Sequence, residues 1–92
     1  MTDCYIFIKE QIVQLVPMYD KIEMRASISD SSCSIEFFVT VNGKRMQCFD
    51  MIDNDLIKES DFDIVANIIA EYVRNTTGYK KGEVNKFSFV FD

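Results

Sequence analysis

Hydrophobic and polar residues alternate along the first half of the chain. Within residues 20–30, every second residue from Ile22 to Ile28 is apolar, and the same period returns over residues 33–41. A period of two is typical of a strand with one buried face. Asn42-Gly43, a strong signal for a two-residue hairpin, comes next. With a third strand over residues 44–51, the pattern predicts an antiparallel three-strand meander.

The two predicted turns decide which side chains share a face. A two-residue turn at Ser31-Ser32 pairs Ile28 with Ile35, and the second turn places Phe37 opposite Cys48. Both turns put the apolar residues of all three strands on one side of the sheet. A slip of one residue would destroy this agreement, so the register is well specified.

Spacings of three and four residues indicate two amphipathic helices. The first covers residues 3–16, with Thr2 or Asp3 as its N-cap. The second covers residues 61–76, after a polar connection over residues 50–60 that ends with Ser60 as N-cap. Its predicted buried stripe consists of Phe62, Val65, Ile68, Ile69, Tyr72 and Val73.

A last strand follows the second helix. Gly78 is a stop signal for the helix, and residues 84–91 alternate so that Phe87, Phe89 and Phe91 share one face. The element order predicts an α+β fold, a two-layer sandwich of order α-β-β-β-α-β with both helices on one face of the sheet. The pattern leaves open whether this strand lies beside the first or the third.

The composition limits the chemistry available to the chain. Its 92 residues make a single domain, residues 1–92. There is no His, and no phosphate loop, GxSxG elbow or HExxH motif occurs. Cys4, Cys33 and Cys48 form no CxxC pair, so we expect reduced thiols, at least two of them buried in the core. We therefore expect a binding protein and not an enzyme, with no cofactor and no metal.

Charge and hydropathy indicate the location and the type of partner. We find no signal-peptide pattern and no apolar run approaching the roughly 18 residues of a membrane span, so we expect a cytoplasmic protein that does not enter the membrane. The formal charge of −5 disfavours direct binding to nucleic acid and favours a basic protein partner. The oligomeric state does not follow from the sequence.

Residues 50–63, here called the acidic segment, carry this charge. They hold six acids and one base, so their net charge of −5 equals that of the whole chain. The acids either solubilise a loop and stabilise the start of the second helix, or they bind a partner. A calcium loop is disfavoured because its Gly and its spaced Glu are absent. The candidate partner-binding acids are Asp53, Asp55, Glu59, Asp61 and Asp63.

A second candidate surface is the outer face of the predicted sheet. In the register above, Phe38 and Phe49 become diagonal neighbours there, with Arg25 opposite Phe38. Aromatic side chains beside an Arg have the composition of a binding hot spot. The alternative is that a loop, another strand or a second copy covers them.

One stretch resembles a known family. A helix that ends at an apolar-Pro pair, an aromatic two residues later and an alternating strand resemble the opening of the YezG-like immunity proteins, here in Ile12-Val13-Gln14-Leu15-Val16-Pro17-Met18-Tyr19-Asp20-Lys21-Ile22-Glu23-Met24-Arg25-Ala26. The acid-then-aromatic strand Ile35-Glu36-Phe37-Phe38, the late second helix and the Phe-rich last strand fit the same pattern. Members are usually longer and carry Trp where Tyr19 stands.

The resemblance implies a function in bacterial competition, such as contact-dependent inhibition. An immunity protein binds and neutralises a toxin delivered by its own cell or a sister cell. Such toxins are often nucleases with basic clefts, which an acidic inhibitor complements. Two other interpretations remain open: a small phage-type inhibitor of a host defence or nucleic-acid enzyme, and a chaperone or adaptor.

Overall fold

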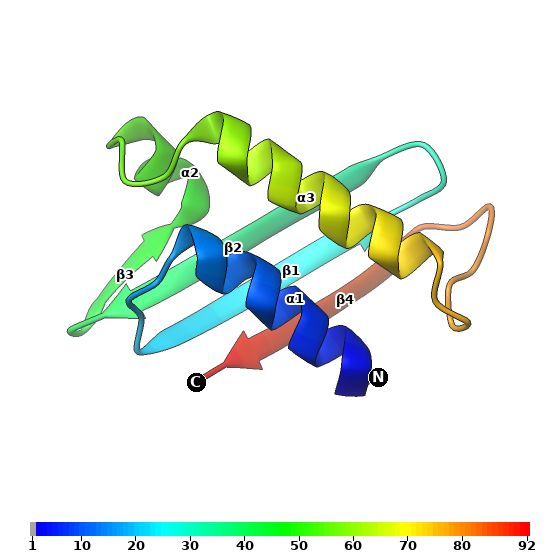
Figure 1. Ribbon diagram of the computed structural model, residues 1–92, viewed down its shortest axis with the longest axis horizontal. Coiled ribbons are helices and arrows are strands. Elements are labelled where there is room, and N and C mark those ends of the chain that lie inside the picture. Colours follow the sequence, from blue (N-terminus) through cyan, green and yellow to red (C-terminus); the bar gives the residue numbers. More distant parts are fainter. Residues whose placement is uncertain (1) are drawn as a thin grey trace.

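Three helices and four strands make up the fold over residues 2–92. The computed structural model describes residues 2–92, with side chains from Cys4 onward. In chain order the elements are α1 (Thr2–Leu15), β1 (Lys21–Ile28), β2 (Cys33–Val41), β3 (Lys44–Gln47), α2 (Cys48–Asp53), α3 (Glu59–Arg74) and β4 (Asn85–Phe91). One antiparallel sheet has the order β3-β2-β1-β4, and α1 and α3 cross the same face of it (Figure 1). The predicted α+β sandwich is confirmed, with α2 as an additional short helix.

The hairpin between β2 and β3 forms as predicted, but β3 is shorter than expected. Asn42 and Gly43 have φ angles of 51° and 80°, which suit a type I′ turn. Pairing ends at Gln47, and Cys48 begins α2, so the predicted pairing of Phe37 with Cys48 in the sheet is wrong. The reason is a change of period, because the apolar residues Cys48, Met51 and Ile52 have helical spacing.

The register of β1 with β2 differs from the prediction by two residues. Ile28 pairs with Cys33 and not with Ile35, so residues 29–32 form the connection. A shift of two keeps every side chain on its predicted face. The wider turn is held by its own polar groups, since the Ser29 N–H donates to the Ser32 carbonyl at 2.9 Å and the two hydroxyls lie 2.7 Å apart.

The last strand lies beside β1 and not beside β3. This places Phe91 opposite Ile22 and Phe89 opposite Met24. Tyr5 of α1 packs its ring edge against Phe89 and Phe91, with centroid distances of 5.5 and 5.0 Å. Helix α1 therefore covers the β4 side of the sheet. The predicted cap by Thr2 or Asp3 lies outside the described side chains.

Helix α3 covers the other side, but both predicted end signals are wrong. The helix begins at Glu59 with Lys58 in the N-cap position and no side-chain cap, so Ser60 lies in its first turn. Gly78 is not its C-terminal stop, because the helix ends at Arg74. Two side chains after the helix cap its C-terminal end. The Asn75 side chain donates to the Glu71 carbonyl at 2.8 Å, and the Thr76 hydroxyl donates to the Val73 carbonyl at 2.7 Å. The residues of α3 that are buried are Phe62, Val65, Ile69, Ala70 and Val73.

Two connections far apart in sequence are joined at Asp30. The Tyr79 hydroxyl donates to one carboxylate oxygen at 2.6 Å, and the Gly82 N–H donates to the other at 2.9 Å. These bonds, that of Tyr79 first, hold the pKa of Asp30 below its usual value, and the bond to Asp30 raises the pKa of Tyr79. Arg74 also donates to the Ser29 carbonyl at 2.9 Å. The β1–β2 turn is thereby fixed to the connection between α3 and β4.

Neighbouring residues of β2 provide a test of the register. Phe37 is 1% exposed in the core, whereas Phe38 lies half-buried on the opposite face. We expect Phe37→Ala to lower the free energy of unfolding by about 3 to 5 kcal/mol. Phe38→Ala should cost only about 1 kcal/mol, because it removes a partly exposed ring. Urea unfolding measures both losses, and equal losses would contradict this register.

The bonds of Asp30 predict how stability depends on pH. The pKa of Asp30 is lowered in the folded state, so its contribution is present above the unfolded pKa and is lost as the pH falls. The pKa of Tyr79 is raised, so its contribution is present below the unfolded pKa and is lost as the pH rises. In unfolding measured across pH, Asp30→Asn should flatten the acid limb and Tyr79→Phe the alkaline limb. Unchanged limbs in both variants would contradict this assignment.

Candidate partner-binding surfaces

The acidic segment occupies one corner of the molecule, formed by α2, the following loop and the start of α3 (Figure 1). All six of its acids are exposed. Among the side chains described from residue 4 onward, the ion pairs are Lys21–Glu23, Arg25–Glu36, Arg45–Glu23 and Arg74–Glu71. The acids of the segment take no part in these pairs, so their charge stays available to an incoming partner.

The loop that carries these acids is held by local bonds. The backbone and side-chain N–H groups of Asn54 both donate to the Asp50 carbonyl, at 3.0 and 2.8 Å. The Leu56 N–H donates to the Met51 carbonyl at 2.8 Å, and the buried Ile57 anchors the end of the loop. Asp55 has a φ of 60°, a left-handed conformation that Asp tolerates better than most residues. The backbone that carries these carboxylates therefore has a defined conformation.

Apolar side chains are exposed on the acidic segment and on the adjoining residues of α2 and α3. Their exposed fractions are 46% for Phe49, 58% for Leu56, 57% for Ile64 and 40% for Ile68. Apolar anchors surrounded by charge are typical of protein-binding surfaces. Leu56 and Ile64 were not among the predicted site residues, and Ile68 was wrongly placed in the buried stripe. Ile64 and Ile68 are four residues apart, so they lie on the same side of α3. This spacing is a sequence signal that could have identified them as a second apolar face of the helix.

The predicted cluster of Phe38, Phe49 and Arg25 does not form. Because β3 ends at Gln47, Phe49 belongs to α2, and its ring packs against Phe62 at 5.7 Å on the helix-covered side. Phe38 and Arg25 remain on the outer sheet face, the face that the helices leave uncovered. The structure thus separates the two predicted aromatics and brings Phe49 next to the acidic segment.

The outer sheet face has its own arrangement around Phe38. The Arg45 guanidinium lies 4.0 Å from the centre of the Phe38 ring, and that of Arg25 lies 6.0 Å away. Arg25 stands opposite Glu36 and not opposite Phe38, with 3.7 Å between the paired atoms. Arg45 was not predicted. The alternation of β3 could have placed Arg45 on the outer face, because it lies two residues before Gln47 on the same strand.

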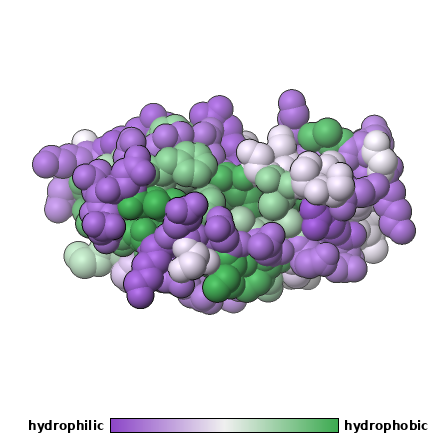
Figure 2. Space-filling model, turned by 90° about the horizontal axis from the view of Figure 1, so that it is seen from above, coloured by the Kyte–Doolittle hydropathy of each residue, from purple (hydrophilic) through white to green (hydrophobic). Residues whose placement is uncertain are grey.

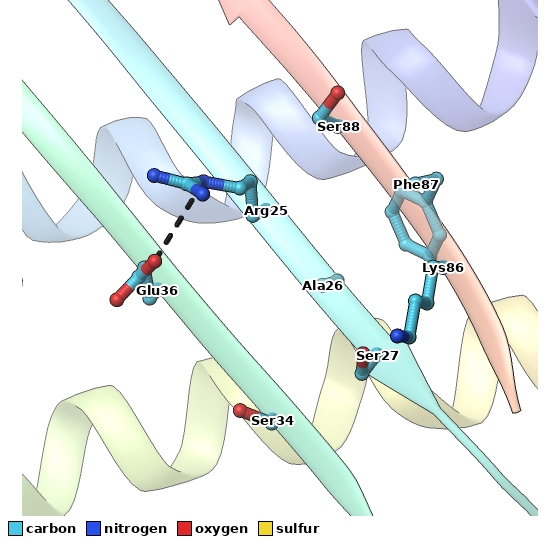
Figure 3. Close-up of a pocket in the computed structure, with 8 residues that line it drawn as sticks. All are labelled: Arg25, Ala26, Ser27, Ser34, Glu36, Lys86, Phe87 and Ser88. Carbon is cyan, nitrogen blue, oxygen red and sulfur yellow. Dashed lines mark ion pairs between the residues drawn. The ribbon is translucent and has the colours of Figure 1, made fainter.

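A shallow hollow of about 400 Å³ lies beside this pair (Figure 3). Figure 3 shows the Arg25–Glu36 ion pair and the Lys86 side chain on the same face as three serines. The side chains that line the hollow on this face are Arg25, Ser27, Ser34, Glu36, Lys86 and Ser88. Hydroxyls and a compensated ion pair can hold a polar group. The Glu36 carboxylate also accepts from Nε2 of Gln47 at 3.0 Å, so both of its oxygens have partners.

The cysteines differ in burial. All three are free, and only Cys48 is fully buried, while Cys4 and Cys33 are half-buried, so the expectation of at least two buried thiols is wrong. Burial raises the pKa of Cys48 and of Cys4. Among the side chains described, no group of three or more Cys, Asp or Glu residues could hold a metal ion. None of the helices described over residues 2–92 is long and apolar enough to cross a membrane.

Comparison with known proteins assigns no family to the chain. No family model matches it, and neither does any curated protein or solved structure. The acidic segment, the apolar side chains around it and the outer sheet face are therefore interpreted from their own geometry and charge.

Proposed function

We propose that this chain is a non-catalytic binding protein that neutralises a basic toxin domain, in the manner of an immunity protein. One observation carries the proposal: six exposed carboxylates without a partner among the described ion pairs share one short stretch of chain, residues 49–64, with the exposed apolar side chains of Phe49, Leu56 and Ile64. Charge and anchors of this kind suit a basic protein surface. The resemblance to the YezG-like proteins supplies the class of partner, a toxin such as a nuclease.

The charge distribution would also orient the partner. The outer sheet face carries Lys21, Arg25, Arg45 and Lys86 against Glu23 and Glu36, so its sign is opposite to that of the acidic segment. A basic partner is attracted to the corner and repelled by the outer face. Such steering raises association rates and is screened over about 8 Å at physiological salt. The partner would then be held by the apolar side chains, which lose water on contact.

The contribution of charge can be tested by neutralising three acids. The partner is first captured with the tagged chain from the native host, and the proposal requires that it be toxic to cells and that the chain suppress this toxicity. With this partner, Asp53→Asn, Asp55→Asn and Glu59→Gln together should slow association about tenfold at low salt and flatten its salt dependence. The free energy of unfolding should change by less than about 0.5 kcal/mol, because these positions are exposed.

A matched variant removes three charges elsewhere. Glu10→Gln, Glu83→Gln and Asp92→Asn lie outside the acidic segment and are also exposed. We expect this control to slow association much less than the first variant. Equal effects of the two variants would show that only the net charge matters and would contradict a binding role for this corner.

The anchors have a separate test. Ile64→Ala and Leu56→Ala should each weaken binding by about 1 to 2 kcal/mol, mainly through faster dissociation, since both remove apolar contact. Val84→Ala is the control, because Val84 is 60% exposed but lies in the connection before β4. Stopped-flow association and dissociation rates measure all three variants. A dissociation rate unchanged by both Ile64→Ala and Leu56→Ala would leave these side chains outside the interface.

A further inference from the structure

One edge of the sheet is open beside α3. The last pair between β2 and β3 is Phe38 with Gln47, so β3 covers only the second half of β2. The first half, residues 33–37, pairs with β1 on one side alone. In Figure 1 the first half of β2 starts at the upper right, at the turn from β1, and passes behind α3.

The alternation of the ladder shows which backbone groups face this edge. Val41 closes a two-residue hairpin, so Val41 and Val39 direct their N–H and C=O groups toward β3. The Thr40 carbonyl accepts from the Asp20 N–H at 2.8 Å on the other side, as the alternation requires. Odd-numbered residues of β2 thus point away from β1.

The open groups can be assigned by continuing this alternation along β2. The position opposite Phe37 is taken by Cys48, the first residue of α2, because the last ladder pair is Phe38 with Gln47. Ile35 and Cys33 remain, and their N–H and C=O groups face outward from the sheet. An added strand pairs with residues whose donors and acceptors point away from the neighbouring strand, as those of Ile35 and Cys33 do.

A groove runs beside these groups. It has a volume of about 380 Å³ and lies between the β2 edge and α3, with Phe49 of α2 at its side. On α3, Ala66 is the one small side chain that lines the groove. Figure 2, which looks down on this side, shows apolar surface bordered by hydrophilic surface. The lining residues are Cys33, Ser34, Ile35, Phe49, Phe62, Asp63, Ala66 and Asn67.

The opposite edge of the sheet, formed by β4, is less suited to pair with a further strand. On β4, the residues that point away from β1 are Lys86, Ser88 and Val90. The Val90 carbonyl already accepts from the Tyr5 hydroxyl at 3.3 Å, and Lys86 adds a charge that disfavours pairing. Residues 33–37 contain neither Lys nor Pro. The edge of β2 is therefore the one suited to receive a strand.

We propose that this edge binds an extended segment of a partner protein as an additional strand, with apolar side chains in the groove and basic side chains toward the acidic segment. Charge identifies the occupant: Asp63 lines the groove, and Asp50 follows the groove residue Phe49. A second copy of the chain would bring two such acidic corners together, which like charges oppose. The inference stands whether or not the partner is a toxin.

Capped peptides of six residues test the proposal directly. Only every second side chain of an added strand faces the groove, so the test peptide, here called the Lys-Val peptide, has two Val and one Lys alternating with Ser. With the isotope-labelled full chain, this peptide at about 1 mM should shift the Ile35 and Cys33 amide signals and slow their hydrogen exchange. It should also slow thiol labelling of Cys33, which lines the groove, and leave that of Cys4 in α1 unchanged. Since no toxin is present, the result is independent of the proposed function.

Matched peptides and variants separate the contributions of backbone and charge. A Lys-Val peptide N-methylated at alternate residues keeps its side chains but cannot pair, and a Glu-Val peptide reverses the charge. Both should bind at least about tenfold more weakly. Asn67→Lys and Ala66→Lys, which place a cation in the groove, should weaken the Lys-Val peptide. Gln14→Lys, the same charge change on exposed α1, should not.

Three results would overturn the proposal. The first is the absence of any change at Ile35 and Cys33 with the Lys-Val peptide. The second is equal binding by the N-methylated peptide, which would show that no strand is added. The third is protection of the edge without peptide in a dimer of this chain, which would make a second copy the occupant. Thermal unfolding checks that the Asn67→Lys and Ala66→Lys variants are folded.

Discussion

The central strand β1 is the constraint on which the fold depends. Its four apolar residues, Ile22, Met24, Ala26 and Ile28, are all buried on one face, and both of its edges are paired. Both α1 and α3 take their positions from this face. One face of β1 is buried and both of its edges are hydrogen-bonded, which fixes its register. A shift of the register by one residue would expose the whole apolar row.

The elements that could be predicted from sequence are those whose signals are local. The alternation of β1 and β2 and the Asn42-Gly43 turn specify a hairpin within a few residues of themselves. The register at Ser29–Ser32 could not be predicted, because the wider turn is stabilised by Arg74, which donates to the Ser32 carbonyl from 42 residues away. The place of β4 depends likewise on Tyr5, at the other end of the chain.

The candidate site divides in the same way. The acids of residues 50–63 could be found because they are contiguous, and the structure places all of them at the surface. Phe49 could not be placed, because its side depends on where β3 ends. Alternation through Met46 and Cys48 continues the strand pattern while the helical spacing of Cys48, Met51 and Ile52 has already begun. The groove could not be predicted from any single stretch of sequence, because β2, α2 and α3 all contribute to its lining.

The contact between α1 and β4 has a consequence for synthesis of the protein on the ribosome. Tyr5 leaves the exit tunnel early, whereas the carbonyl that its hydroxyl binds belongs to a residue 85 positions later. Until that strand emerges, β1 has an unpaired side, and α1 can stack Phe7 on Tyr72 of α3 but lacks Phe89 and Phe91 as partners for Tyr5. The hairpin and α3 can assemble during translation, but closure of the core waits for the last strand. Folding is thereby tied to the length of chain already made, and we expect nascent chains that stop before β4 to need protection from aggregation.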